Sequence, residues 1–93
     1  MTRVVLPGAL RQFSGGASSV DVPLGDGGTL RDVLDALDEQ QPALARRIRD
    51  EQGELRRFVN VYVDGEDARR SGGLAAPVAA GAEVLVLPSV AGG

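Results

Sequence analysis

Apolar residues occur along the chain in four short runs with the spacing of β-strands: residues 3–7, 19–23, 58–63 and 83–87. The first and last runs are continuous, a pattern typical of strands that are covered on both faces or paired in parallel. The second run alternates with a period of two, and the third is a β-branched and aromatic run followed by the turn signal Asp64-Gly65. A short fifth strand fits near residues 66–70. We expect the runs at the two ends of the chain to lie side by side in the centre of a sheet.

One segment has the period of an amphipathic helix. It begins at Thr29, whose hydroxyl can cap the helix. Asp32, three residues later, is in the capping-box position, where its carboxylate can bind the Thr29 amide and complement the positive end of the helix. A single apolar face is formed by residues at i, i+3, i+4 and i+7, namely Leu30, Val33, Leu34 and Leu37. Pro42 interrupts this helix, and residues 43–49 are predicted to form a second, short helix.

The order strand, strand, helix and then two or three strands predicts a mixed sheet that grips one helix. We therefore expect an α+β fold of the β-grasp (ubiquitin-like) type, with a four- to five-stranded sheet packed on one main helix and a short second helix. The glycine-rich segments are interpreted as turns between these elements. They are Gly15-Gly16, Gly25-Asp26-Gly27-Gly28 and Ser71-Gly72-Gly73.

Composition limits what such a chain can do. Its 93 residues, 43% of them apolar, suffice for one domain. Cysteine, histidine and lysine are all missing from the sequence, which removes the usual metal ligands, general bases and activated nucleophiles. The apolar run near Met1 is too short for a signal peptide or a membrane span, so we expect a cytoplasmic protein without membrane contact.

Carboxylates occur in two groups. One group is Asp64, Glu66 and Asp67, and the other is Asp35, Asp38 and Glu39. The first lacks the spacing of a calcium loop and is interpreted as a solvated turn. The second lies on the polar face of the predicted helix, where it serves solubility or a partner's basic surface. The glycine-rich loops lack the lysine of a phosphate-binding loop. We therefore predict neither a catalytic residue nor a metal site nor a cofactor bound by this chain.

All ten basic residues are arginine, and most of them lie between residues 46 and 70. These are Arg46, Arg47, Arg49, Arg56, Arg57, Arg69 and Arg70. If the fold brings them together, they form a basic patch that could steer docking to an acidic partner; otherwise they belong to a solvated surface mixed with carboxylates. The net charge of −3 and the scarcity of aromatic residues argue against nucleic acid as a partner.

The last residues of the chain are the best candidate for reactivity. We divide the chain into a domain, residues 1–88, and a tail, residues 89–93, that ends in Gly92-Gly93. Glycine has no Cβ, so such a tail can enter a narrow cleft and present its carboxylate to another protein. A carboxylate is inert at neutral pH and must be activated, for example by adenylation with ATP. Attack by a sulfur donor on the acyl-adenylate then gives a thiocarboxylate.

Three segments resemble the MoaD/ThiS family of ubiquitin-like sulfur carrier proteins, in particular its CysO-type members. They are Arg57 to Asp67, Ser71 to Ala75, and the ending Leu87-Pro88-Ser89-Val90-Ala91-Gly92-Gly93. The resemblance covers nearly the whole chain. Ser89 and Ala82 depart from the pattern of molybdopterin synthase small subunits, which have proline and an acidic residue there. A molybdopterin role is therefore disfavoured.

The resemblance implies that Gly93 is adenylated by a MoeB/ThiF-type adenylyltransferase and sulfurtransferase, which uses ATP and magnesium, and then carries a thiocarboxylate. Gly92 and the arm Pro88, Ser89, Val90 and Ala91 would thread into the partner. It further implies transfer of the sulfur to a PLP-dependent cysteine synthase, with release of cysteine by a JAMM-type metallopeptidase. Related carriers supply thiazole or thiosugar synthases. The chain itself would be a co-substrate and not an enzyme.

Two other functions stay open at this point. A ubiquitin-like modifier would be conjugated through Gly93 to lysines of target proteins, although the chain offers no lysine for conjugation to itself. A plain β-grasp interaction domain would never have its tail activated. These alternatives differ in the fate of the same carboxylate.

Overall fold

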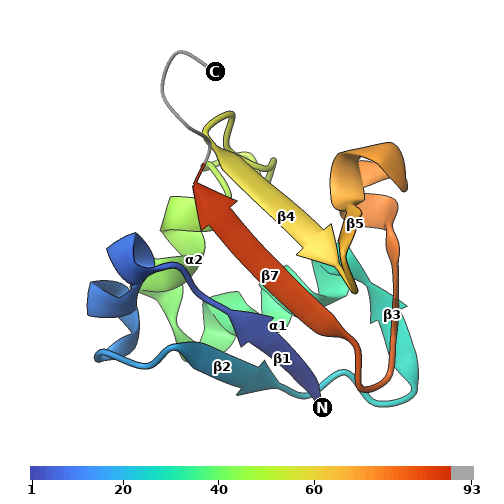
Figure 1. Cartoon of the computed structure of the whole chain (residues 1–93), viewed down its shortest axis with the longest axis horizontal. Coiled ribbons are helices and arrows are strands. Elements are labelled where there is room, and N and C mark those ends of the chain that lie inside the picture. The colour runs from blue at the N-terminus through green and yellow to red at the C-terminus, as the bar shows by residue number, and fades with distance from the viewer. Residues whose placement is uncertain (89–93) are drawn as a thin grey trace.

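The computed structural model describes residues 1–88, and its main feature is a five-stranded mixed sheet with the strand order β2-β1-β7-β4-β5. The strands are β1 (Thr2–Val5), β2 (Ser19–Val22), β4 (Val59–Val63), β5 (Glu66–Asp67) and β7 (Glu83–Pro88). The helices α1 (Leu30–Gln40) and α2 (Pro42–Ile48) lie behind the sheet in Figure 1, so the face turned to the viewer is not covered by them. The predicted sheet and its two helices are confirmed.

The two ends of the described chain meet at the centre of this sheet. β1 runs parallel to β7, with Val4 opposite Val84, and β7 is antiparallel to β4 on its other side. Val4, Val84 and Val86 are completely buried. The prediction that the two continuous apolar runs form inner strands paired with each other is confirmed. β1 and β7 each have a strand on both sides, so their backbone groups are satisfied within the sheet.

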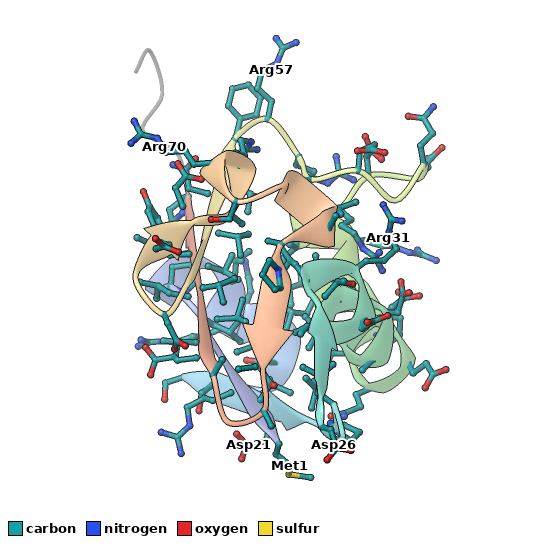
Figure 2. All side chains as sticks on the ribbon, turned by 90° about the vertical axis from the view of Figure 1, so that its right-hand side faces the viewer. Met1, Asp21, Asp26, Arg31, Arg57 and Arg70 are labelled. Carbon is teal, nitrogen blue, oxygen red and sulfur yellow. The ribbon has the colours of Figure 1, made fainter. Side chains whose placement is uncertain are left out.

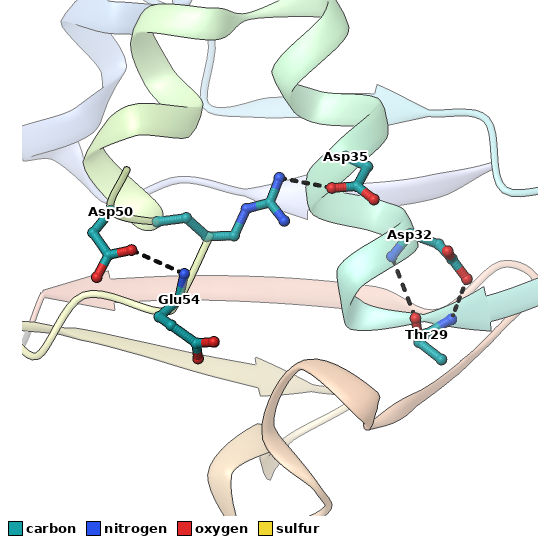
Figure 3. Close-up of polar contacts among 6 residues, drawn as sticks. Thr29, Asp32, Asp35, Asp50 and Glu54 are labelled. Atoms are coloured by element: carbon teal, nitrogen blue, oxygen red, sulfur yellow. Dashed lines mark hydrogen bonds and ion pairs between the residues drawn. The ribbon is translucent and has the colours of Figure 1, made fainter. Parts of the chain in front are cut away.

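α1 begins with the predicted capping box. The Asp32 amide donates to Thr29 Oγ1 over 3.3 Å, and the Thr29 amide donates to the Asp32 carboxylate over 2.9 Å (Figure 3). The four residues of the predicted apolar face are all fully buried. Pro42 is the first residue of α2, a position that needs no amide hydrogen, so it starts the second helix as well as ending the first.

A second, two-stranded sheet was not predicted. β3 (Gly27–Thr29) pairs antiparallel with β6 (Pro77–Ala79), and Gly28 lies opposite Val78. The interpretation of Gly25 to Gly28 as a turn alone is thus wrong for its second half. Gly27 has φ 114°, and a Cβ there would lie 3.0 Å from the Val78 carbonyl oxygen. Glycine has a low propensity for strands, but at this position it allows the backbones of β3 and β6 to approach each other closely.

Three short 3₁₀ helices also escaped prediction: η1 (Gly8–Ser14), η2 (Ala68–Arg70) and η3 (Gly73–Ala75). The predicted fifth strand is therefore limited to β5, after which the chain turns into η2. The turn at Asp64-Gly65 is confirmed, since both residues have positive φ, 49° and 87°. No helix within residues 1–88 is long and apolar enough to cross a membrane.

We expect Thr2→Val to stabilise the protein. Thr2 is completely buried, and its Oγ1 has no hydrogen-bond partner among residues 1–88. Valine keeps the shape and removes the unpaired hydroxyl, so the free energy of unfolding in urea should rise by about 1 kcal/mol. In contrast, Thr29→Val removes a helix cap and should lower it by about 1 kcal/mol. A destabilised Thr2→Val variant would contradict this interpretation of the Thr2 hydroxyl.

Candidate functional site

The candidate site lies where the chain leaves the sheet. The last residue of β7, Pro88, lies opposite Val59, the first residue of β4, and Leu87 lies opposite Asn60. Pro88, the first residue of the predicted arm, is thus the last residue of the sheet. The predicted tail, residues 89–93 with the Gly92-Gly93 end, lies outside the described residues. The site is therefore described from the surface around the end of β7.

The uncovered face of the sheet carries an apolar strip next to this point. Because side chains alternate along a strand, the buried Val84 and Val86 leave Leu85 and Leu87 on the opposite face. Tyr62 of β4 and Val5 of β1 are the direct neighbours of Leu85 on either side. We call Val5, Tyr62, Leu85 and Leu87 the open-face strip.

Phe58 is a further apolar side chain at the same end of the molecule. It directly precedes β4, and 66% of its surface is exposed, whereas the following Val59 is only 7% exposed. The sequence pattern placed Phe58 inside the strand and gave it no separate role. An exposed aromatic ring is typical of a surface that contacts another protein.

Part of the predicted basic patch assembles beside Phe58. The Arg56 Nε donates to the Arg46 carbonyl oxygen over 2.6 Å. Arg69 of η2 donates to the Arg56 carbonyl oxygen over 3.0 Å and to the Asn60 side-chain oxygen over 3.1 Å. These bonds fasten η2 to the beginning of β4, so they bring together arginines that lie far apart in the sequence.

The other arginines of the predicted patch have different surroundings. Arg49 pairs with Asp35 of α1 at 2.9 Å, and Arg47 stacks over the ring of Phe13 at 4.4 Å from its centre (Figure 3 shows the Arg49 pair). Asp35 therefore has an intramolecular partner, and its side chain stays 61% exposed on the polar face of α1. This pair lies in a surface hollow between the helices and residues 49–56.

The carboxylates near β5 hold turns in place. Asp64 accepts a hydrogen bond from the Glu83 amide, and Asp67 accepts one from the Arg69 amide, each over 2.9 Å. Asp64 and Asp67 thus stabilise turns by accepting hydrogen bonds from backbone amides, which agrees with the interpretation of this segment as a turn. Within residues 1–88, no group of three or more acidic, histidine or cysteine side chains could hold a metal ion.

Comparison with known proteins identifies the family. The model of the ThiS family matches residues 4–93. The chain belongs to the ThiS family. It is 44% identical over 92 residues to the sulfur carrier protein CysO of Mycobacterium tuberculosis, covering 97% of this chain and 96% of that protein. It is also 38% identical over 78 residues to small archaeal modifier protein 1 of Haloferax volcanii, covering 84% and 85% of the two chains.

Solved structures of the family confirm the fold. The crystal structure of M. tuberculosis CysO superimposes with a TM-score of 0.84 at 40% identity, covering 97% of this chain and all of that one. A chain of the Amycolatopsis orientalis BexX/CysO complex gives a TM-score of 0.87 at 39% identity over the full length of both chains. The ubiquitin-like β-grasp fold and the resemblance to CysO-type carriers are both confirmed.

The contacts of Arg69 predict a contrast with its neighbour. Arg69→Ala should lower the free energy of unfolding by about 1 kcal/mol, because it removes the bonds that hold η2 on β4. Arg70→Ala is the matched control, since Arg70 is exposed and should change it by less than about 0.5 kcal/mol. Urea denaturation of both variants checks the contrast. Equal effects would show that the Arg69 bonds contribute nothing measurable.

Proposed function

We propose that this chain is a sulfur carrier whose Gly93 carboxylate is adenylated and then converted to a thiocarboxylate. The observation that carries the proposal is the 44% identity to CysO over 97% of the chain, together with the Gly92-Gly93 end that follows the strand β7. In the first step, the carboxylate attacks the α-phosphorus of ATP and pyrophosphate leaves. Sulfide-level sulfur then attacks the acyl carbon as HS⁻, AMP leaves, and loss of the remaining proton gives the thiocarboxylate.

In this proposal the chain supplies a carboxylate and a docking surface, while partner enzymes supply the catalysis. Residues 89–93 can extend about 17 Å beyond Pro88 when fully stretched, which is enough to reach into a cleft while the domain stays outside. Gly92 and Gly93 have no side chains to obstruct a narrow passage. The open-face strip and Phe58 offer the apolar surface on which a partner can rest.

The partners we propose act on the carrier in turn. A MoeB/ThiF-type enzyme would adenylate Gly93 with ATP and magnesium in the cytoplasm and add sulfur. A PLP-dependent cysteine synthase, or a thiazole or thiosugar synthase, would accept the sulfur, and a JAMM-type metallopeptidase would release cysteine where cysteine is the product. Similarity to a chain of the BexX/CysO complex supports docking on a partner protein.

Sulfur transfer can be measured directly on the intact protein. After incubation with a MoeB/ThiF-type enzyme, ATP, magnesium and a sulfur donor, we expect the mass of the carrier to rise by the difference between sulfur and oxygen. A chain that lacks Gly92 and Gly93 should gain no sulfur, because its carboxylate is moved to the bulkier Ala91. If the full-length chain with intact Gly93 gains no sulfur while the enzyme loads a carrier already known to be its substrate, the proposal fails for that enzyme class.

A second candidate is a protein modifier, which the similarity to small archaeal modifier protein 1 favours. Here the activated Gly93 would form an isopeptide bond with a lysine of a target protein. This function predicts adducts of higher mass in cell extracts, detected with an antibody to the carrier, that disappear when Gly93 is deleted. Finding the thiocarboxylate without any adducts would favour the carrier function alone.

A further inference from the structure

Four arginines lie in the segments next to the end of β7. Arg56 and Arg57 come just before Phe58 and β4, whose Val59 lies opposite Pro88, and Arg69 bonds to the carbonyl of Arg56. Arg70 follows Arg69 in η2. Figure 2 shows Arg57 and Arg70 at one end of the molecule, and Asp21 and Asp26 at the opposite end. We call Arg56, Arg57, Arg69 and Arg70 the arginine collar.

No guanidinium group of the arginine collar forms a salt bridge within residues 1–88, but Arg56 shares a surface hollow with four carboxylates and Arg70 shares one with Glu66 and Asp67. The salt bridges within residues 1–88 join Arg3 to Asp21 and Arg49 to Asp35, and neither includes a collar residue. The guanidinium groups of Arg56 and Arg69 donate to carbonyl and amide oxygens, which carry no net charge. Arg57 and Arg70 thus present exposed guanidinium groups at one end of a chain whose net charge is −3.

We infer that the arginine collar docks against aspartate and glutamate side chains at the mouth of the cleft that receives the tail. This inference rests on the proposed function, because it takes the tail to enter an activating enzyme. With the tail inserted, Pro88 lies at the mouth, and Gly93 can lie about 17 Å deeper. With the tail extended in this way, the collar lies too far from the reacting carboxylate to contact the phosphates of ATP, and its counterpart is the rim of the enzyme.

The side chains of this surface fit a protein partner of that kind. Arginine can bind a carboxylate through two parallel hydrogen bonds, and exposed opposite charges accelerate encounter and select orientation. Phe58, exposed next to Arg57, adds an apolar anchor of the type found at the centre of protein interfaces. A nucleic acid is disfavoured because the net charge of the chain is −3 and few aromatic side chains are available for stacking.

The test compares charge reversals at two places on the surface. Arg57→Glu and Arg70→Glu change the collar, while Arg31→Glu changes an exposed arginine of α1 and alters the net charge equally. The probe is a purified MoeB/ThiF-type enzyme with ATP and magnesium. Pyrophosphate release is followed against carrier concentration at about 0.05 M and about 0.5 M salt, because added salt screens exposed charges. Thermal unfolding confirms that each variant folds.

At low salt we expect each collar variant to raise the KM for the carrier about tenfold, since electrostatic encounter is lost. The kcat should stay within about twofold, because the reacting carboxylate is unchanged. High salt should raise the KM of the wild type toward that of the variants. Arg31→Glu should behave as the wild type at both salt concentrations.

The possible failures can be told apart. If the wild-type chain is not adenylated by an enzyme that adenylates a carrier already known to be its substrate, the proposed function fails for that enzyme class and the inference fails with it. If the wild type is adenylated but the collar variants match Arg31→Glu in KM, the inference alone is overturned. It is also overturned if the wild type binds duplex DNA in a mobility-shift assay and the collar variants do not.

Discussion

The parallel pairing of β1 with β7 is the interaction on which the rest of the fold depends. It joins the beginning of the chain to the last described strand, and it gives β7 hydrogen-bonded neighbours on both sides, β1 and β4. With β7 in this position, Val84 and Val86 can lie on the core beneath α1. An edge position would leave one row of backbone groups of β7 exposed. The last strand of the domain is therefore hydrogen-bonded to the sheet along both of its edges.

The two faces of the sheet differ because the helices cover only one of them. One face is closed by α1 and α2, whose leucines complete the core, and the capping box at Thr29 sets where α1 begins. The other face keeps the open-face strip accessible along β7 and β4. Apolar surface, an exposed aromatic ring and exposed arginines thus lie near the end of β7.

The parts of the fold that could be predicted are those encoded by local patterns. The strand runs, the apolar face of α1 and its cap follow from residue periodicity and spacing. The pairing of the first and last strands followed because both are continuous apolar runs. β3 could not be predicted from propensity, since Gly27 and Gly28 signal a turn locally and act as strand residues only because β6 lies close.

The layout of the surface around the end of β7 could not be predicted. The absence of cysteine, histidine and lysine directs attention to the Gly93 carboxylate, whose conversion to a thiocarboxylate is a prediction that the family resemblance implies. The division of the arginines depends on distant partners: Arg49 meets Asp35, and Arg69 meets Arg56. Neither contact has a local signature. Phe58 is an aromatic residue of the kind enriched in strands, so the sequence placed it inside the third strand. In the structure β4 begins only at Val59, and Phe58 lies just before it and is exposed.

The position of β7 has a mechanical consequence. A pull on the chain beyond Pro88 acts along the axis of β7, so it loads the hydrogen bonds to β1 and β4 in shear rather than one after another. To draw β7 out of the sheet, such a force must break both ladders together and expose Val84 and Val86 to water. A pull on the end of this chain therefore meets more resistance than it would if β7 were an edge strand.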